Sequence, residues 1–399
     1  MKLEIKGKYT SAICMTDSVE SSSISQLEAV CNHERFENVK IRVMPDVHTG
    51  VGCVVGFTAK VKDFAIPNLV GVDISCSVSA YNIGRQKVDF DKLDSFIRKN
   101  IMYGTWVRKS VSPLVSDELA EKVTKVCEEI GDKKSDRHLK AIGSLGGGNH
   151  FIEMAGKPKD MWLLIHTGSR NFGKQICEFH QQKAVGYNMR LRDGHRKDVL
   201  ETVPEEDRQA FIESHNWDEP FNKQLAHLDG DLLREYIEHM NVAKEFAEAN
   251  HKILAHDIVS AMKWQVKEEI MTNHNYIEIL PDGMMIRKGA ISAKFDEKCI
   301  IPLNMRDGSL ICVGKGNDEW NQSAPHGAGR VLSRTKAKES LSLAEFQKVM
   351  KGVWSSCVHK GTLDESPMAY RNKKHIIESV GETVDIIEQI KPLYNFKGV

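Results

Sequence analysis

Five short loops hold an unusual concentration of glycine together with histidine, cysteine or aspartate, and each follows a segment that predicts a β-strand. The loops span residues 45–52, 71–78, 144–153, 163–173 and 321–338. Polar side chains at strand ends are held in place by the rigid scaffold beneath them, so loops from distant segments can gather at one edge. The chain must therefore fold around β-sheets that bring widely separated segments to a common site.

Hydrophobic periodicity predicts strands in the first third of the chain and helices after them. Strands are expected at 39–45, 51–60, 68–73 and 77–84, and helices at 89–101 and 116–131. In the second helix, Leu119, Val123 and Val126 keep the spacing of one buried face. The glycine turn at 146–148 should precede two more strands.

A helix-rich excursion is expected from about residue 172 to residue 270. Its last part, residues 232–264, is too long for one unbroken helix of average length, so we expect a break there. Short strands return at 284–313, followed by a glycine turn and a helix over 331–341. No stretch rich in Pro, Gly or Ser divides the chain, which favours a single domain over residues 1–399.

Charge and cysteine content exclude several classes of protein. Lys and Arg number 55 and Asp and Glu number 55, so any polyanion must be bound by a local basic patch and not by bulk charge. The nine cysteines include no CxxC pair, which argues against a disulfide framework and a zinc ribbon. The charged N-terminus does not have the pattern of a signal peptide, and we expect a cytoplasmic protein.

The first two loops contribute carboxylates, an imidazole and a thiol. Asp46 and His48 lie beside Gly50 in the first loop, where a turn with a local hydrogen bond is the simpler interpretation. Asp73 and Cys76 lie three residues apart in the second, at the expected end of an apolar strand. A buried cysteine is usually inert, so the pair gains interest only from the histidines of the other loops.

The third loop places Asn149, His150 and Glu153 directly after three consecutive glycines. Successive glycines can expose backbone N–H groups as an anion-binding nest, and the histidine adds a metal ligand at its edge. A tight hairpin with exposed polar residues is the structural alternative.

Two further histidines occupy similar positions. His166 directly follows four apolar residues in the fourth loop, with Arg170 four positions later, and His274 has comparable surroundings. Such a position suits a ligand, although a hydrogen-bonded core histidine is the commoner case.

The fifth loop is the most informative. His326 precedes a glycine turn and a segment with the basic residues Arg330, Arg334, Lys336 and Lys338. If that segment is a helix, its N-terminus would favour phosphate next to the imidazole. The loop has neither the Walker A pattern nor a GxGxxG fingerprint.

Together these loops predict a metal-and-phosphate active site. Five histidines of the excursion lack adjacent glycine loops and are interpreted as surface or packing residues: His215, His227, His239, His251 and His256.

The motifs in these loops are similar, in order and over nearly the whole chain, to those of the RtcB family of RNA ligases. They are PDVHTGVG, GVDISCSV, GGGNHFIE, HTGSRNFG, TNHNY, HGAGRVLSRTKAK, DESPMAYRN and the C-terminal FKG. The resemblance implies a mixed α+β fold with central β-sheets flanked by helices. It also implies joining of a 2′,3′-cyclic phosphate or 3′-phosphate RNA end to a 5′-hydroxyl end, with GTP and two manganese ions, through a covalent histidine–GMP intermediate.

The resemblance also implies roles for individual residues. His326 would be the nucleophile and Asp46 an acidic residue beside the metals. The metal ligands would be Asp73, Cys76, His150, His166 and His274, with Cys76 shared by both ions. Contacts to the guanylate would come from Asn149, Glu153, Asn304, Gly327, Ala328, Gly329, Tyr370 and Lys397. Ligand softness alone would assign a Cys/His/Asp site to zinc, and manganese is taken from the resemblance.

RNA is the expected partner, with tRNA or rRNA as candidates, and the local basic patch would include Arg170, Arg330, Arg334 and Lys336. The chain departs from the family pattern at Ser75 and Ser77, where glycines are usual, and at Asn304, where a serine is usual. These departures suggest a divergent bacterial paralogue that repairs a particular RNA. Two alternatives remain, namely a metal-dependent cyclic phosphodiesterase and a non-catalytic RNA-binding paralogue.

Overall fold

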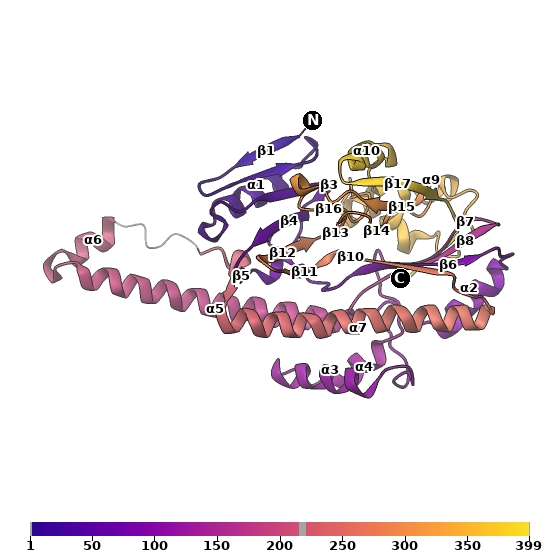
Figure 1. Ribbon diagram of the computed structural model, residues 1–399, viewed down its shortest axis with the longest axis horizontal. Coiled ribbons are helices and arrows are strands. Elements are labelled where there is room, and N and C mark those ends of the chain that lie inside the picture. The colour runs from indigo at the N-terminus through magenta and orange to yellow at the C-terminus, as the bar shows by residue number, and fades with distance from the viewer. Residues whose placement is uncertain (1, 215–220, 399) are drawn as a thin grey trace.

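The computed structural model of the chain describes residues 2–214 and 221–398 (Figure 1). β-Sheets occupy the centre, and two long helices run beneath them. The largest sheet has six strands in the order β1-β2-β3-β4-β12-β11. Its strands are β1 (Leu3–Lys6), β2 (Ser11–Cys14), β3 (Ile41–His48), β4 (Val55–Val61), β12 (Gly283–Lys288) and β11 (Asn275–Leu280).

A five-stranded antiparallel sheet positions most of the site. Its order is β10-β6-β8-β7-β18, from strands β10 (Glu268–Asn273), β6 (Ser77–Gly84), β8 (Asp160–Thr167), β7 (Phe151–Lys157) and β18 (Pro392–Lys397). His166 lies opposite Val78 of β6 and Phe151 of β7. This register places the residues just before β6 and β7, which include Cys76 and His150, next to the end of β8.

Three smaller sheets complete the strand content. One has the order β14-β15-β17, and the other two are the pairs β13-β16 and β5-β9. These strands are β14 (Lys298–Asn304), β15 (Gly308–Gly314), β17 (Val384–Ile390), β13 (Ala290–Ser292), β16 (Ser323–Pro325), β5 (Phe64–Ala65) and β9 (Leu228–Asp229). β16 ends directly before His326 and so fixes the position of that residue.

Helices cover the sheets, and α3 and α4 pack on the far side of α7 from the strands (Figure 1). The α-helices are α1 (Ser21–Cys31), α2 (Phe90–Asn100), α3 (Asp117–Glu129), α4 (Ser135–Ala141), α5 (Arg170–Thr202), α6 (Arg208–Ser214), α7 (Gly230–Met262), α8 (Arg334–Ser340), α9 (Leu343–Val349) and α10 (Lys373–Ser379). Short 3-10 helices occur at Glu34–Phe36, Pro67–Leu69, Glu205–Asp207, Lys223–Leu225, Asp318–Trp320, Lys360–Glu365, Pro367–Ala369 and Val380–Glu382. The mixed α+β fold agrees with the expectation from the sequence.

The expected break in the second half of the excursion is absent, because α7 is one continuous helix of 33 residues. Its buried side chains recur every three or four positions, as Tyr236, Met240, Ala243 and Phe246 illustrate. That continuous apolar face packs against both α3 and α5, so tertiary contacts stabilise a length well above the average helix. The helix ends at Lys263, which adopts a left-handed conformation.

Two other expectations about local structure are wrong. Residues 68–73 form no strand; Pro67–Leu69 is a 3-10 helix and a loop follows it. Cys76 therefore precedes a strand and does not follow one. The helix expected at 331–341 begins only at Arg334, where the Ser333 hydroxyl accepts a hydrogen bond from the Lys336 N–H. His326 consequently lies in a loop and does not directly precede the helix, although Ser333 and Arg334 at the start of α8 line the same cavity as His326. No helix in the described part of the chain is long and apolar enough to cross a membrane.

Candidate active site

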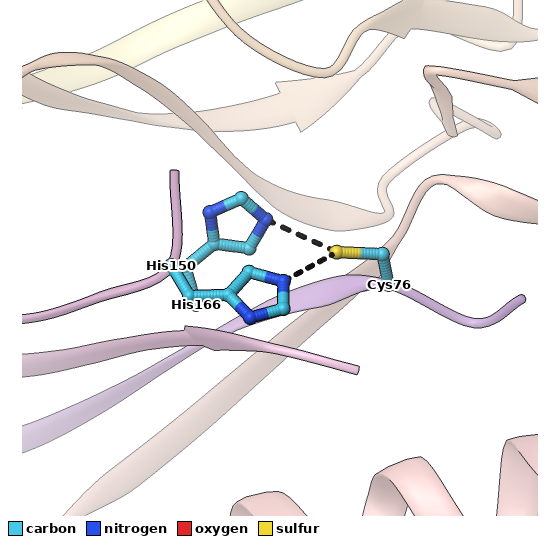
Figure 2. A group of neighbouring side chains, drawn as sticks. All are labelled: Cys76, His150 and His166. Carbon is cyan, nitrogen blue, oxygen red and sulfur yellow. Dashed lines mark hydrogen bonds between the residues drawn. The ribbon is translucent and has the colours of Figure 1, made fainter. Parts of the chain in front are cut away.

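Three predicted metal ligands converge at the end of the five-stranded sheet (Figure 2). The Cys76 Sγ atom lies 3.4 Å from His150 Nε2 and 3.3 Å from His166 Nε2. All three side chains are buried. Asp73 extends the group, since its Oδ2 atom is 3.2 Å from His150 Nε2. The thiol, two imidazoles and carboxylate come from three separate segments.

The donor set fits a divalent transition metal. Buried polar atoms in folded proteins nearly always have a partner, yet Asp73 Oδ1 and His150 Nδ1 have none. Burial, reinforced by neighbouring histidines, lowers the pKa of His166 well below its usual value. That ring is therefore neutral at pH 7 and offers a lone pair. Burial, reinforced by Asp73, raises the pKa of the Cys76 thiol, and a bound cation would offset this cost by stabilising the thiolate.

His274 connects this cluster to His326. Its ring centroid lies 5.4 Å from that of His166 and 4.9 Å from that of His326. Its position is fixed through the backbone, because the His274 N–H donates to the Cys76 carbonyl oxygen. Burial, followed by the neighbouring His326, lowers the pKa of His274 well below its usual value. The five predicted ligands and the predicted nucleophile thus form one continuous group.

His326 is oriented by a buried carboxylate. Its Nδ1 atom lies 2.7 Å from Oδ2 of Asp46, whose side chain is fully buried on β3. The Gly327 N–H also donates to Asp46 Oδ2 at 3.2 Å. A carboxylate next to Nδ1 favours the ring tautomer in which the Nε2 lone pair is free for attack. His48, which belongs to the same motif, donates its Nδ1–H to the Asp46 carbonyl oxygen and is a neighbour of His326.

Two positions near these histidines require glycine, because neighbouring atoms lie too close for a Cβ atom. A Cβ atom at Gly146 would lie 1.7 Å from His150 Nδ1. A Cβ atom at Gly329 would lie 2.6 Å from the Asp46 carbonyl oxygen, and Gly329 also has a φ of +71°. These glycines allow the backbone to pass close to His150 and Asp46, which is a different role from the anion nest that the sequence predicted for the third loop.

A cavity of about 400 Å³ adjoins the histidines, within the roughly 300–1,000 Å³ range typical of small-molecule sites. His166 and His326 line it. All eight residues predicted to contact the guanylate also line it: Asn149, Glu153, Asn304, Gly327, Ala328, Gly329, Tyr370 and Lys397. The structure therefore brings the predicted nucleotide residues and the nucleophile to a single space.

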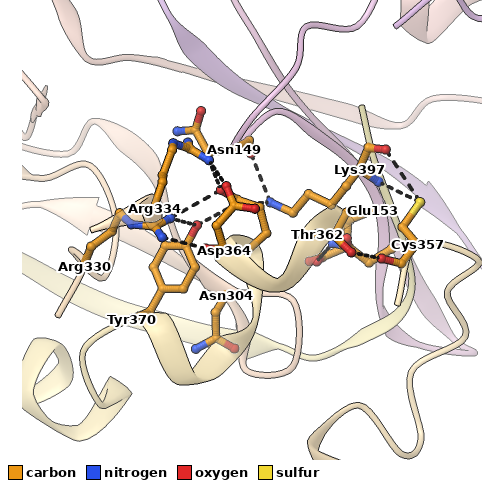
Figure 3. A network of polar contacts seen from close by, with 12 residues as sticks. Asn149, Glu153, Asn304, Arg330, Arg334, Cys357, Thr362, Asp364, Tyr370 and Lys397 are labelled. Atoms are coloured by element: carbon orange, nitrogen blue, oxygen red, sulfur yellow. Dashed lines mark hydrogen bonds and ion pairs between the residues drawn. The ribbon is translucent and has the colours of Figure 1, made fainter. Parts of the chain in front are cut away.

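Glu365 is the main residue of this cavity that the sequence analysis missed, and its partners Arg334, Tyr370 and Lys397 are labelled in Figure 3. It is fully buried and contacts Lys397 at 3.0 Å, Arg334 at 2.6 Å and the Tyr370 hydroxyl at 2.7 Å. Burial alone would raise the pKa of Glu365, but Lys397 and Arg334 lower it to about 2. The sequence does carry a signal for Glu365, because it lies in the motif DESPMAYRN together with Tyr370, a residue predicted to contact the guanylate.

Two other residues that were predicted to contact the guanylate have hydrogen-bond partners within the protein. The Asn304 Oδ1 atom accepts hydrogen bonds from the Arg306 and Asp307 N–H groups in the β14–β15 turn. Asn304 also lines the cavity. Burial raises the pKa of Glu153 to about 8, while Asn395 donates to its carboxylate at 2.7 Å. Glu153 would therefore bind a ligand as a mostly protonated acid at neutral pH.

The four residues of the predicted basic patch have different partners in the structure. Arg330 and Arg334 are paired with the carboxylates next to the cavity, and Lys336 is exposed on α8. Arg170 is held by the Gly104 carbonyl oxygen and the Ser144 hydroxyl. Their contact with RNA stays a prediction.

The remaining histidines and cysteines behave as packing or surface residues. His227, His239 and His251 are buried, and the His256 side chain is 57% exposed. His215 lies outside the described residues. All nine cysteines are free and buried, which agrees with the absence of a disulfide pattern.

Comparison with known proteins gives a consistent result. A family model described as tRNA-splicing ligase RtcB matches residues 26–130 and 116–398. RNA-splicing ligase RtcB of Escherichia coli strain K12 is 30% identical over 382 residues, which cover 90% of each chain. RNA-splicing ligase RtcB1 of E. coli strain ATCC 25922 is 29% identical over 391 residues with the same coverage. tRNA-splicing ligase RtcB of Methanococcus maripaludis is 27% identical over 430 residues, covering 89% of this chain and 87% of the relative.

Proposed function

Because this chain belongs to the RtcB family and is an RNA ligase, we propose that it joins 3′-phosphate or 2′,3′-cyclic phosphate RNA ends to 5′-hydroxyl ends, with GTP as the activating substrate. The observation that carries this proposal is the His326–Asp46 pair. A histidine nucleophile oriented at 2.7 Å by a buried carboxylate opens onto a cavity that is also lined by His166 of the cysteine–histidine cluster.

The first step forms a covalent guanylate. His326 attacks the α-phosphorus of GTP through Nε2, so that an N–P bond forms while the bond to pyrophosphate breaks and pyrophosphate leaves with the electron pair. The Asp46 carboxylate, whose Oδ2 atom lies 2.7 Å from Nδ1, stabilises the positive charge that develops on the ring. Glu365, Lys397 and Tyr370 shape the end of the cavity that would hold the base.

The second and third steps transfer the activation to RNA. An oxygen of the RNA 3′-phosphate attacks the guanylate phosphorus, and the N–P bond breaks with its electrons returning to His326. The 5′-hydroxyl then attacks the activated 3′-phosphate, losing its proton as GMP leaves with the electron pair. A cyclic phosphate is first opened by water to the 3′-phosphate.

The ligands for metal would be Asp73, Cys76, His150, His166 and His274. Manganese, the metal we propose, would neutralise phosphate charge and polarise the reacting oxygens when bound. The neutral imidazoles and the unpartnered Asp73 Oδ1 support a metal at these ligands, whereas the choice of manganese rests on the family. The protein's own contribution is to hold these ligands within reach of the nucleophile.

The proposal is tested with GTP labelled at the α-phosphate and manganese. We expect label on the wild-type protein, stable to denaturation, and none on His326→Ala. His256→Ala is the matched control, because that exposed histidine on α7 does not line the cavity next to His326 and should leave labelling unchanged. Label retained by His326→Ala would mean that another residue is the nucleophile.

Two further assays on a wild-type protein, of cyclic-phosphate opening and of RNA binding, separate the two alternatives. A wild-type protein that takes no label but opens a cyclic phosphate would be a phosphodiesterase. One that does neither while binding RNA would be a non-catalytic paralogue.

A further inference from the structure

A second cavity, of about 550 Å³, lies at the end of the five-stranded sheet that is remote from the cysteine–histidine cluster. β6 begins next to Cys76 and ends at Gly84, and the lining of the cavity starts at Arg85. Since a strand rises about 3.4 Å per residue, roughly 24 Å of strand separates the cavity from the cluster. The β7–β8 turn and the start of α2 form other walls, and these elements lie together at one end of the molecule (Figure 1). Among the described residues, none lines both this cavity and the one next to His326, so the two would hold separate ligands.

A stack of aromatic rings ends in the floor of the second cavity. Phe90 stacks on Tyr394 with ring centroids 5.9 Å apart and an angle of 18° between the planes. Tyr394 in turn stacks on Trp354 with centroids 5.4 Å apart. Phe90 is the one ring of the three that lines the cavity, and Tyr394 covers one of its faces, so the rest of the Phe90 ring can receive a further planar ring. The remaining floor is apolar and comes from Val88, Met161 and Leu393.

The rim of the second cavity is positively charged. Arg85, Lys87 and Lys159 line it, and all three are exposed. Within residues 2–214 and 221–398, their side chains form no hydrogen bond or ion pair with the protein. The lining includes no acidic residue from the described part of the chain, since Asp89 caps α2 and Asp160 accepts an amide N–H from β6. On a chain with a formal net charge of zero, three unpaired cations at one cavity are a local excess available to an anion.

We propose that the second cavity binds a nucleoside phosphate, with the base stacked on Phe90 and the phosphates paired with Arg85, Lys87 and Lys159. Its volume lies within the roughly 300–1,000 Å³ range of small-molecule sites. Stacking on an aromatic ring combined with cations for the phosphates is a general way in which proteins hold nucleotides. An anion without a ring would use the cations alone and leave the open part of Phe90 uncovered. A free nucleotide and a nucleotide within an RNA chain offer the same chemistry.

The test measures binding of radiolabelled ADP to the full chain by equilibrium dialysis. Phe90→Leu keeps an apolar side chain but removes the ring, and we expect it to weaken ADP binding roughly 5- to 150-fold, the range for loss of one stacked base. Phe295→Leu changes an exposed aromatic residue that does not line the cavity and should leave ADP binding unchanged. ADP bound next to His326 would appear as a separate component that neither substitution alters.

Fragments of the nucleotide separate the two halves of the site. Adenosine lacks the phosphates, so its binding should respond to Phe90→Leu but not to the double variant Lys87→Gln, Lys159→Gln. Pyrophosphate should show the reverse pattern. The double variant should weaken ADP binding at least about tenfold, the lower limit for loss of a hydrogen bond to a charged group. Both lysines are exposed, so this variant should keep the stability of the wild type in urea, which makes it independent of any folding defect in Phe90→Leu.

An oligoribonucleotide with both ends blocked identifies the source of the nucleotide. If the oligoribonucleotide depends on Phe90 and the two lysines while ADP does not, the ligand is a nucleotide within an RNA chain, and the reverse result assigns a free nucleotide. The proposal is overturned if neither probe responds to Phe90→Leu. It is also overturned if decanoate, an anion without a ring, loses as much affinity as ADP in that variant.

Discussion

At the scale of single residues, Ser75 stands in a backbone conformation that favours glycine. Its φ is +56°, and its buried hydroxyl has no hydrogen-bond partner. A left-handed conformation costs an ordinary residue roughly 1–2 kcal/mol. The other serine of this loop is different, because the Ser77 hydroxyl bonds to the Ser75 carbonyl oxygen at 3.1 Å and to His251 at 2.9 Å.

The two serines should therefore respond in opposite directions to substitution. We expect Ser75→Gly to raise the free energy of unfolding by about 1 kcal/mol. Ser77→Ala should lower the free energy of unfolding by about 1–3 kcal/mol, because the buried Ser75 carbonyl oxygen and the His251 ring would each lose the Ser77 hydroxyl as a hydrogen-bond partner. Urea unfolding of both variants measures this, and destabilisation by Ser75→Gly would show that the strain is relieved elsewhere in the loop.

Cys76 gives a second prediction at this scale. Cys76→Ala should abolish tight manganese binding and guanylate labelling, because it removes the thiol that contacts both His150 and His166. Metal retained per chain after dialysis is the measurement. Cys127→Ala removes another buried thiol, on α3, and should leave manganese uptake unchanged. Wild-type labelling of the Cys76 variant at limiting manganese would contradict a shared ligand.

At the scale of elements, the long helix α7 depends on its packing. Phe246 is fully buried and stacks on Phe172 of α5 with ring centroids 5.2 Å apart. We expect Phe246→Ala to lower the free energy of unfolding by about 3–5 kcal/mol, since a large cavity would remain. The exposed Phe295 supplies the matched control, for which Phe295→Ala should stay within about 0.5 kcal/mol in the same urea titration. Similar losses for both would mean that α7 is not held by this contact.

At the scale of the whole molecule, the proposed histidine–guanylate route predicts the origin of the junction phosphate. With an RNA labelled in its terminal 3′-phosphate and a 5′-hydroxyl partner, the label should become resistant to phosphatase within the joined product. The reaction should require GTP, and a partner with a 5′-phosphate should not be joined. Digestion to nucleotides locates the label. Joining supported equally by ATP, or a junction phosphate from a 5′ end, would exclude the histidine–guanylate route.

The sequence by itself determined the chemistry of the site. Imidazole, thiol and carboxylate groups are identifiable as residue types, and glycine neighbours marked the loops that carry them. The predicted ligands Cys76, His150 and His166 do form one cluster. The strand predicted at 77–84 has the same bounds as β6, which is buried along its whole length, because a short run with apolar residues that ends at a glycine is a local signal.

Tertiary structure decided what depends on contacts between distant segments. Packing against α3 and α5 keeps α7 continuous, and local periodicity carries no record of that packing. Asp46 could be recognised as acidic, but its contact with Nδ1 of His326 required β3 and β16 to meet. Glu365 went unnoticed for the same reason. A carboxylate gains its role from the cavity beside it, and that cavity exists only after the chain has folded.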